Sequence, residues 1–259
     1  MSREAIYVRS DGAEVPLVPE PYCEFCCKPI KDDYADLGTC YDCHTAGSRV
    51  GGEYTTNADG RTRTTVRFLA DLRPFFFRRA GAVGLYVSKL SFLYPEIWIL
   101  KGGTRDGPKV AALLAECMDH VIDTRFQEFG DASVLVPIPS GSGNSEASIL
   151  LARELAERRD GMLVVESLRF AEGYVQQRGQ NAEARWENPK GKVSVNPRTV
   201  SRLAGNTVLL IDDTFVEGGT AHWCSEAILG AGASDVYVLT VGRNVGPKEL
   251  EYVGYTGRL

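Results

Sequence analysis

The stretch Val208-Leu-Leu-Ile-Asp-Asp-Thr-Phe-Val-Glu-Gly-Gly-Thr-Ala221 decides how the chain is expected to fold. Its first four residues are apolar, which is typical of a strand buried on both faces of a parallel sheet. Asp212 and Asp213 follow, and a loop of small residues then leads into a helix predicted over 220–230. Because ligands of open α/β sheets lie beyond the carboxyl ends of the strands, this stretch also marks the expected functional edge.

Outward from this stretch, helix-like and strand-like segments alternate from about residue 110 to residue 241. Apolar runs predict strands at 134–138, 162–165, 207–211 and 235–241. Helical spacing of apolar residues predicts helices at 108–122, 147–159 and 220–230. Strands that are apolar throughout and separated by helices predict an α/β fold, with a parallel sheet covered by helices on both faces.

The loop at 214–220 has the composition of a phosphate site. Backbone N–H groups at a helix N-terminus bind phosphate, and glycine lets the backbone approach the ligand closely. The hydroxyls of Thr214 and Thr220 add donors, whereas the two preceding carboxylates suit sugar hydroxyls or a magnesium ion that bridges to the ligand. A plain strand–turn–helix with an N-capping aspartate is the alternative interpretation.

Five of the seven cysteines lie between residues 23 and 43, in two Cys-x-x-Cys pairs and one adjacent position. Two such pairs complete a tetrahedral zinc site that has no open position, so we expect a structural metal. Its ligands would be Cys23, Cys26, Cys40 and Cys43. Cys27 and His44 are adjacent spare ligands. Metal binding would order the segment 21–60, which has almost no apolar periodicity of its own.

The composition is that of an ordinary globular protein with an acidic balance. The 259 residues are 44% hydrophobic, and the formal net charge of −5 excludes a protein that is basic overall and coats nucleic acid. The most apolar window, 81–100, contains Lys89, Pro95 and Glu96, so it predicts core and no membrane association. Residues 1–10 are polar and mixed in charge, and we expect a cytoplasmic protein without an export signal.

The acidic pair and its threonine- and glycine-containing loop resemble the phosphoribosyl pyrophosphate-binding motif of type I phosphoribosyltransferases. The chain from about Cys23 to Val241 is similar to the ComF family, in which an N-terminal cysteine module precedes such a domain. The further elements that carry the similarity are Val134-Leu-Val-Pro-Ile-Pro139, Lys101-Gly-Gly103, and Gln177, Arg185 and Asn188 at the family's spacing.

The resemblance implies a zinc-ribbon-like module at 1–60 and a type I phosphoribosyltransferase-like domain at 61–259, built on a parallel sheet flanked by helices. It implies that Asp212 and Asp213 are the catalytic pair and contact the ribose hydroxyls. The other implied substrate contacts are Thr214, Phe215, Val216, Glu217, Gly218, Gly219 and Thr220 around the 5′-phosphate, Ser140, Gly141 and Ser142 near pyrophosphate and magnesium, and Lys101, Gln177 and Arg185.

The residues support two functional hypotheses. The first is an enzyme that uses magnesium and transfers the phosphoribosyl group from phosphoribosyl pyrophosphate to a nitrogen acceptor, a nucleobase or an amine. The second is a non-catalytic adaptor that binds DNA or a protein partner through the zinc module and the arginine- and phenylalanine-rich segment 61–79. The ComF resemblance implies that such an adaptor would act in DNA uptake or processing. The segment 61–79 is alternatively an amphipathic element whose phenylalanines pack in the core. The double aspartate favours the enzyme, whereas Glu217, in place of one of the family's threonines, and the short segment after Pro139 favour the adaptor.

Overall fold

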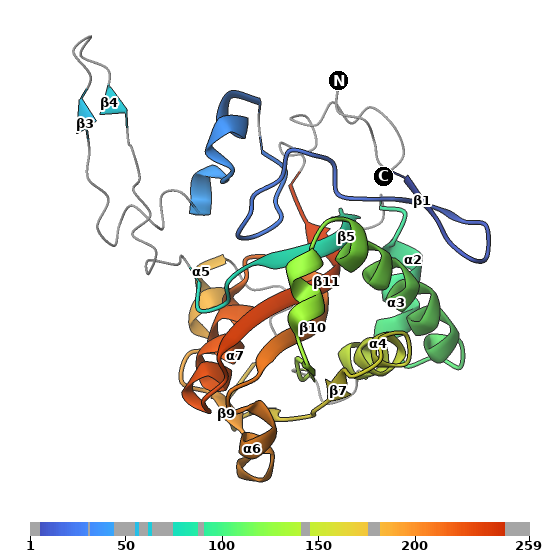
Figure 1. Ribbon diagram of the computed structural model, residues 1–259, viewed down its shortest axis with the longest axis vertical. Helices are drawn as coiled ribbons and strands as arrows, with labels where there is room; N and C mark the ends of the chain where they lie inside the picture. Colours follow the sequence, from blue (N-terminus) through green and yellow to red (C-terminus); the bar gives the residue numbers. More distant parts are fainter. Residues whose placement is uncertain are drawn as a thin grey trace.

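The computed structural model describes residues 6–30, 32–43, 55–56, 62–63, 75–87, 91–140, 146–175 and 182–246. At its centre lies a five-stranded parallel sheet with strand order β5-β11-β10-β6-β7 (Figure 1). The strands are β5 (Ala80–Tyr86), β6 (Val134–Pro137), β7 (Leu163–Val164), β10 (Thr207–Phe215) and β11 (Asp235–Asn244). The parallel direction of every pair confirms the predicted α/β class.

Helices cover both faces of this sheet (Figure 1). They are α2 (Tyr94–Lys101), α3 (Gly107–Thr124), α4 (Ala147–Ala156) and α7 (Gly219–Gly230). Leu209 and Ile211 of β10 join one core cluster with residues of α2, α3 and α4. Val208 and Leu210, which point to the opposite face, join a second cluster with residues of α7. The sheet is therefore buried on both faces, as its uninterrupted apolar runs predict.

β10 is longer than the sequence predicted. The expected strand ends at residue 211, whereas the observed strand ends at Phe215. The pairing with β11 continues this far, because Phe215 still lies opposite Arg243 in the parallel ladder. The acidic pair therefore belongs to the strand, and the turn before α7 is shorter than the predicted loop 214–220.

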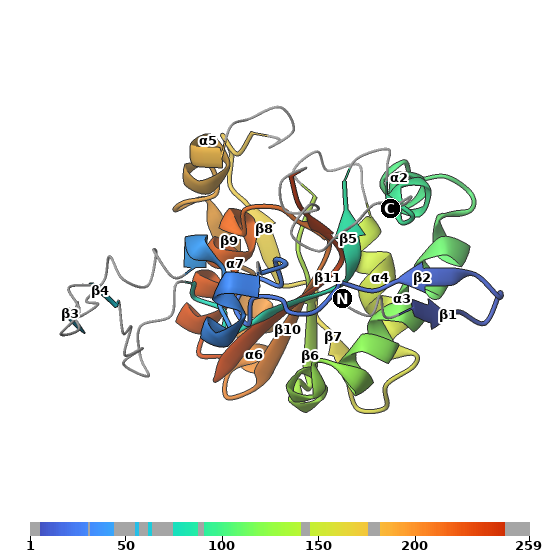
Figure 2. The ribbon, with the colours of Figure 1, turned by 90° about the horizontal axis from the view of Figure 1, so that it is seen from above.

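The N-terminal segment lies along β5, the strand at one edge of the sheet (Figure 2). Its first elements form an antiparallel hairpin of β1 (Ile6–Val8) and β2 (Glu14–Pro16). Further along, Val18 donates its N–H to the carbonyl oxygen of Val83 at 3.0 Å, and Ala80 donates to that of Phe25 at 2.8 Å. These hydrogen bonds cover backbone groups that an edge strand would otherwise leave unpaired.

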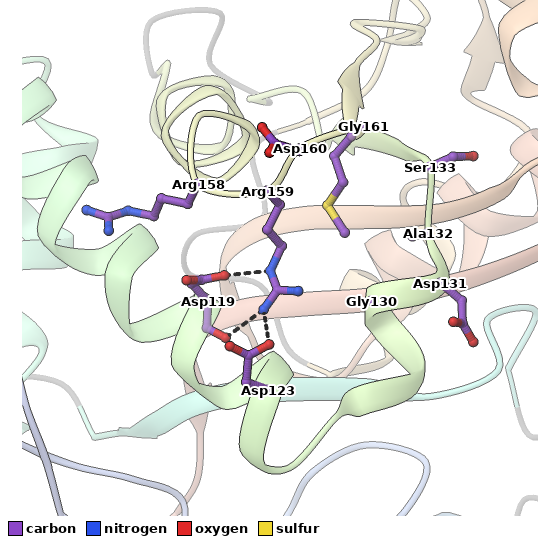
Figure 3. A pocket seen from close by; sticks show the side chains of 11 residues that line it. Asp119, Asp123, Gly130, Asp131, Ala132, Ser133, Arg158, Arg159, Asp160 and Gly161 are labelled. Carbon is purple, nitrogen blue, oxygen red and sulfur yellow. Dashed lines mark hydrogen bonds and ion pairs between the residues drawn. The ribbon is translucent and has the colours of Figure 1, made fainter.

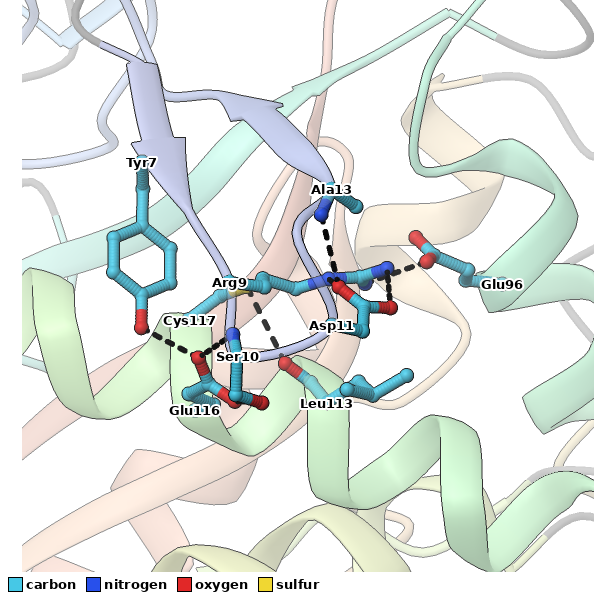
Figure 4. A network of polar contacts seen from close by, with 9 residues as sticks. All are labelled: Tyr7, Arg9, Ser10, Asp11, Ala13, Glu96, Leu113, Glu116 and Cys117. Atoms are coloured by element: carbon cyan, nitrogen blue, oxygen red, sulfur yellow. Dashed lines mark hydrogen bonds and ion pairs between the residues drawn. The ribbon is translucent and has the colours of Figure 1, made fainter.

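A polar network ties the hairpin to α2 and α3 (Figure 4). The Glu116 carboxylate of α3 accepts hydrogen bonds from the Tyr7 hydroxyl at 2.7 Å and from the Ser10 N–H at 2.6 Å. The buried Arg9 guanidinium donates to Glu96 of α2 at 2.5 Å. The network therefore holds α2 against the hairpin. The last residue of α2, Lys101, lies at the candidate site described below.

The smaller elements were not predicted from the sequence. They are the 3-10 helices η1 (Asp32–Leu37), η3 (Gln127–Asp131) and η4 (Pro197–Thr199), the helices α5 (Ala182–Glu187) and α6 (Val200–Leu203), and the antiparallel pairs β3 (Thr55–Thr56) with β4 (Thr62–Arg63) and β8 (Leu168–Phe170) with β9 (Val193–Val195). Among the described residues, no helix has both the length and the apolar character that a bilayer crossing requires.

The division of the chain into 1–60 and 61–259 stays a prediction. Around this boundary the structure describes only 55–56 and 62–63. Of the segment 61–79 the structure describes only 62–63 and 75–79. There Phe77 is buried in a core cluster, as the amphipathic alternative predicts, whereas Phe76 is exposed. The interpretation as a nucleic-acid-binding segment stays a prediction.

Candidate functional site

The acidic pair lies toward the carboxyl end of β10, where the strand meets α4. Asp212 Oδ1 accepts a hydrogen bond from the backbone N–H of Asp213 at 2.9 Å and another from Ser148 Oγ at 3.0 Å. Ser148 belongs to the first turn of α4 and is itself buried. A hydroxyl from a remote helix thus holds the Asp212 carboxyl in place. The sequence analysis missed Ser148, because nothing in its local sequence indicates this contact.

Lys101, the last residue of α2, supplies a counter-charge to the second carboxylate. Its Nζ lies 2.8 Å from Asp213 Oδ1 and donates to Thr214 Oγ1 at 3.2 Å. Thr214 Oγ1 in turn donates to Asp213 Oδ1 at 2.7 Å. The Asp213 side chain is 13% exposed and that of Lys101 is 43% exposed, so the ammonium group retains access to solvent. The structure therefore places these three predicted site residues together.

Two ionisable groups of this site, Asp212 and Lys101, have shifted pKa values. Burial, and then the neighbouring charge of Asp213, raise the pKa of Asp212 to about 7. Burial alone would lower the pKa of Lys101, but the charge of Asp213 and the hydrogen bond to it outweigh that effect and raise this pKa. Near neutral pH, Asp212 can therefore exchange a proton while Lys101 stays charged.

The turn between β10 and α7 depends on two glycines. Gly218 has φ +86° and precedes the helix without a side-chain cap, so it leaves the first N–H groups of α7 available to a ligand. A Cβ on Gly219 would come within 2.9 Å of the Arg185 carbonyl oxygen and of Trp186 Cα. The missing side chain therefore allows α5 to approach the N-terminus of α7 closely.

Val216 and Glu217, which stand where the similar family has threonines, lie in different environments. Glu217 is exposed, and within the described residues its carboxylate makes no hydrogen bond or ion pair. Val216 is half-buried, and its carbonyl oxygen accepts a hydrogen bond from Arg243 Nη1 at 2.6 Å. The negative charge of Glu217 thus remains solvated beside the start of α7.

Among the remaining predicted site residues, the structure describes Ser140 and Arg185 but not the other three. Ser140 follows β6 at the same edge of the sheet, because Ile138 donates its N–H to the Ile211 carbonyl oxygen at 2.9 Å and keeps the two strands level. Arg185 lies on α5, whose backbone contacts the start of α7. Outside the described residues lie Gly141, Ser142 and Gln177.

An aromatic cluster that the sequence analysis missed surrounds the first turn of α7. The His222 ring centroid lies 4.5 Å from that of Phe76 and 4.8 Å from that of Trp186. His222 Nδ1 accepts the backbone N–H of Phe76 at 3.3 Å, and burial lowers the pKa of His222 to about 4. The imidazole is therefore neutral near pH 7. No single stretch of sequence indicates this cluster, because its members come from separate segments.

The second polar centre is the four-cysteine cluster, formed by Cys23, Cys26, Cys40 and Cys43. All four side chains are buried, and their Sγ atoms lie within 4.8 Å of one another. Thiolates about 2.3 Å from a tetrahedral zinc ion are about 3.8 Å apart. The observed separation of Cys26 Sγ and Cys40 Sγ is 3.6 Å. The four thiols therefore fit a tetrahedral metal ion, and the cluster could bind zinc.

A tight backbone turn presents the first two thiols. Cys27 has φ +56°, a left-handed value that few residues other than glycine adopt. The Cys27 N–H donates to the Cys23 carbonyl oxygen at 2.9 Å, and the Cys23 N–H donates to that of Lys28 at 2.8 Å. Cys27 itself packs in the opposite core, where burial raises its pKa to about 12. It is therefore not a member of the cluster, and His44, the other predicted spare, lies outside the described residues.

A separate hollow of about 500 Å³ lies at the amino ends of the strands, on the side of the sheet away from the acidic pair (Figure 3). One of its lining residues is Ser133, which precedes β6. Arg159 crosses the hollow and contacts Asp119 at 2.6 Å and Asp123 at 2.5 Å. The hollow is therefore a salt-bridged surface feature that is remote from the acidic pair.

Comparison with known proteins gives only distant similarities. No protein-family model and no curated protein sequence matches the chain. Among solved structures, the chain is similar to an allosteric regulatory enzyme of purine biosynthesis, with a TM-score of 0.37 and 16% identity over 62% of this chain and 42% of that one. It is similar to glutamine phosphoribosylpyrophosphate amidotransferase from B. subtilis, with a TM-score of 0.39 and 15% identity over 78% of this chain and 43% of that one.

A further similar structure is orotate phosphoribosyltransferase from Aeropyrum pernix, with a TM-score of 0.32 and 15% identity over 83% of this chain and 99% of that one. The chain spans less than half the length of the first two proteins. The fold itself rests on the strand order, the helices on both faces and the four-cysteine cluster of this chain.

Proposed function

We propose that this chain binds phosphoribosyl pyrophosphate with magnesium and transfers its phosphoribosyl group to a nitrogen acceptor, a nucleobase or an amine. The observation that supports this most directly is the position of the acidic pair and the N-terminus of α7 at the same end of β10. The proposal includes membership of the ComF-like phosphoribosyltransferases and a cytoplasmic location. The free, buried thiols suit the reducing conditions of that compartment.

Each part of the ligand has a matching group at this end of the sheet. The carboxylates of Asp212 and Asp213 would accept hydrogen bonds from the ribose hydroxyls. The N–H groups at residues 217–220 would bind the 5′-phosphate, which the positive end of the α7 dipole favours. Lys101 already offers an ammonium group here, and its exposed side chain would turn from Asp213 toward pyrophosphate.

The proposed reaction is a displacement at the anomeric carbon of the ribose. The bond from C1 to the pyrophosphate oxygen breaks, and its electron pair leaves with pyrophosphate. The lone pair of the acceptor nitrogen forms the new C1–N bond, and this nitrogen loses a proton. Bound magnesium would neutralise charge on the departing diphosphate. The chain itself would position the sugar and stabilise the developing charges, without a covalent nucleophile.

For the four-cysteine cluster we infer structural zinc. Bound zinc would be coordinated by the thiolates of Cys23, Cys26, Cys40 and Cys43, with no open position for a substrate. The residues around the cluster have little apolar periodicity, so crosslinking of the four thiols would supply order there.

A second candidate function is a non-catalytic adaptor in DNA uptake or processing. The exposed Glu217 favours it, because a carboxylate beside the start of α7 repels the phosphate that the enzyme would bind there. In this function the zinc module and the segment 61–79 would contact DNA or a protein partner.

The deciding experiment is calorimetric titration of the chain with phosphoribosyl pyrophosphate and magnesium. The double variant Asp212→Asn/Asp213→Asn should abolish binding without loss of the circular dichroism of the fold. Asp131→Asn, at the opposite edge of the sheet, is the matched control and should bind normally. Wild-type affinity in the double variant would refute the site assignment.

A thermal melt separates the two functions. A ligand at about 100 times its dissociation constant should stabilise the wild-type chain by about 2.7 kcal/mol. Absence of any shift at millimolar ligand would contradict the enzyme and favour the adaptor. Binding without acceptor-dependent release of pyrophosphate would identify a ligand-binding adaptor. DNA binding that weakens as salt rises would support the adaptor directly.

A further inference from the structure

Arg243, near the end of β11, joins the two polar centres of the molecule. The residue is 5% exposed and lies opposite Phe215 in the β10–β11 ladder. Its Nη1 donates to the carbonyl oxygens of Phe215 at 3.1 Å and Val216 at 2.6 Å. Its Nη2 lies 3.9 Å from Cys26 Sγ. One buried guanidinium group therefore contacts both the four-cysteine cluster and the turn that leads into α7.

The charge of Arg243 has no carboxylate partner among the described residues. Besides carbonyl oxygens, its neighbours are the Phe215 ring, 5.0 Å from Cζ, and the sulfur of Cys26. Burying an unpaired cation is costly, so a nearby negative group is needed to offset it. Four thiolates around a divalent metal ion carry a net charge of −2, since four negative charges exceed the two positive ones. The metal-loaded cluster is thus the counter-charge that Arg243 otherwise lacks.

The same guanidinium orients the peptide groups of the turn. In a planar trans peptide the C=O and the following N–H point in opposite directions. The hydrogen bond to the Val216 carbonyl oxygen therefore directs the N–H of Glu217 away from Arg243. The hydrogen bond to the Phe215 carbonyl oxygen does the same for the N–H of Val216. Arg243 thus sets the directions of the N–H groups that precede α7.

We propose that Arg243 is a positioning residue that couples the four-cysteine cluster to the turn before α7, so that metal binding at the cluster and anion binding at the turn favour each other. The anion half of this statement rests on the proposed function, whereas the coupling of the cluster to the backbone of the turn does not. By linkage, each ligand raises the affinity for the other by the same factor, which for coupled sites is typically about fivefold to 150-fold.

The test uses the full chain loaded with zinc and two substitutions of Arg243. Arg243→Met removes the charge at similar length, and Arg243→Lys keeps the charge but loses the fork that reaches both centres. Arg9→Met is the matched control, because Arg9 is equally buried but pairs with Asp11 and Glu96. The measurements are zinc release to a colorimetric chelator and hydrogen exchange of the backbone amides at 215–220.

We expect Arg243→Met to release zinc and to exchange these amides about tenfold faster than wild type. Arg243→Lys should retain zinc but exchange the amides faster, because one ammonium group cannot bridge the carbonyl oxygens and the sulfur. Arg9→Met should change neither readout beyond its effect on overall stability. If Arg243→Met does not fold, Arg243→Lys and the chelated wild-type chain carry the test.

The coupling is overturned if zinc removal from the wild type leaves exchange at 215–220 unchanged, or if Arg243→Met behaves as the Arg9→Met control does. Titration with phosphoribosyl pyrophosphate and magnesium separates this result from the proposed function. If the wild type does not bind this ligand but zinc and exchange respond to Arg243, the proposed function fails and the coupling of cluster to turn stands. If the ligand binds equally with and without zinc, the reciprocal effect on anion affinity is refuted.

Discussion

The four-cysteine cluster and the acidic pair both crowd like groups together, and they resolve the repulsion in different ways. In the cluster, four Sγ atoms lie within 4.8 Å of one another, and their thiolates would be balanced by a metal ion from outside the chain. At the acidic pair, the chain supplies its own partners: Lys101 for Asp213 and Ser148 for Asp212. If the cluster binds structural zinc as proposed, the first centre depends on a ligand for its order, whereas the second is already assembled within the chain.

Loss of the metal should change the chain more than any of the substitutions below. Removal of the metal by a chelator should expose residues 23–43 to limited proteolysis, because the ion that would link the four cysteines is lost. Metal-binding free energies of structural zinc sites are on the order of 10 kcal/mol, so denaturant unfolding of this region should shift strongly. Cys117→Ala, which removes a buried thiol outside the cluster, is the control and should keep its metal. Identical proteolysis with and without chelator would contradict the dependence on metal.

The second effect is a pH dependence that originates at Asp212. Its folded pKa of about 7 exceeds the unfolded value of about 3.9, so the folded chain holds a proton that the unfolded chain releases. This contribution to stability is complete below about pH 3.9 and is lost as the pH rises through about 7, with a slope of at most about 1.4 kcal/mol per pH unit.

Urea unfolding of wild type and Asp212→Asn across this pH range measures the contribution, because titrating groups that do not interact with Asp212 cancel in the difference. The stability of wild type relative to Asp212→Asn should fall as the pH rises. A difference that stays constant would show that Asp212 ionises normally in the folded chain.

The third effect concerns Lys101, whose ammonium group balances the charge of Asp213. Lys101→Met should weaken binding of phosphoribosyl pyrophosphate about tenfold, or about 1.4 kcal/mol, because it removes the ammonium group expected to meet pyrophosphate. Calorimetry measures the affinity, and Lys101→Arg, which keeps the charge, should recover part of it. Equal affinity in Lys101→Met and wild type would remove Lys101 from the ligand site.

A weaker change is expected at Ser148, whose hydroxyl is the hydrogen-bond partner of Asp212. Ser148→Ala removes a single hydrogen bond and should lower the free energy of unfolding by about 1 kcal/mol. It should also raise the pKa of Asp212 further, since the Ser148 hydrogen bond lowers that pKa. The pH series described for Asp212→Asn measures both changes. An unchanged profile would mean that Ser148 does not support the carboxylate.

The two centres also differ in how far the sequence predicts them. Spacing within one short segment identifies Cys23, Cys26, Cys40 and Cys43, and the structure brings these thiols together. Asp212 and Asp213 are identified in the same local way, from an apolar strand followed by acids. Their partners are not, because Ser148 lies 64 residues from Asp212 and only the packing of α4 on β10 brings it close.

The length of β10 also depends on contacts that the local sequence does not indicate. The sequence predicts β10 from its apolar run, but the strand continues through polar residues because β11 pairs with them up to Arg243. Propensity within one segment cannot indicate such an extension, since the hydrogen bonds belong to two segments. Arg243 illustrates the point further: its contacts with Cys26 and Val216 depend on three segments that are distant in sequence.

The eight-residue helix α2 has a consequence for the response of the site to ionic strength. A helix this short has marginal stability by itself. An ion pair with a residue distant in sequence holds each of its ends: Arg9 pairs with Glu96 near the first turn, and Asp213 pairs with Lys101 in the last turn. Dissolved ions screen the half-exposed Lys101 pair well before they weaken the buried Arg9 pair. Moderate salt should therefore loosen the contact of Lys101 with Asp213 at one end of α2 while the other end stays anchored, so the side chain of Lys101 is the part of the candidate site most sensitive to salt.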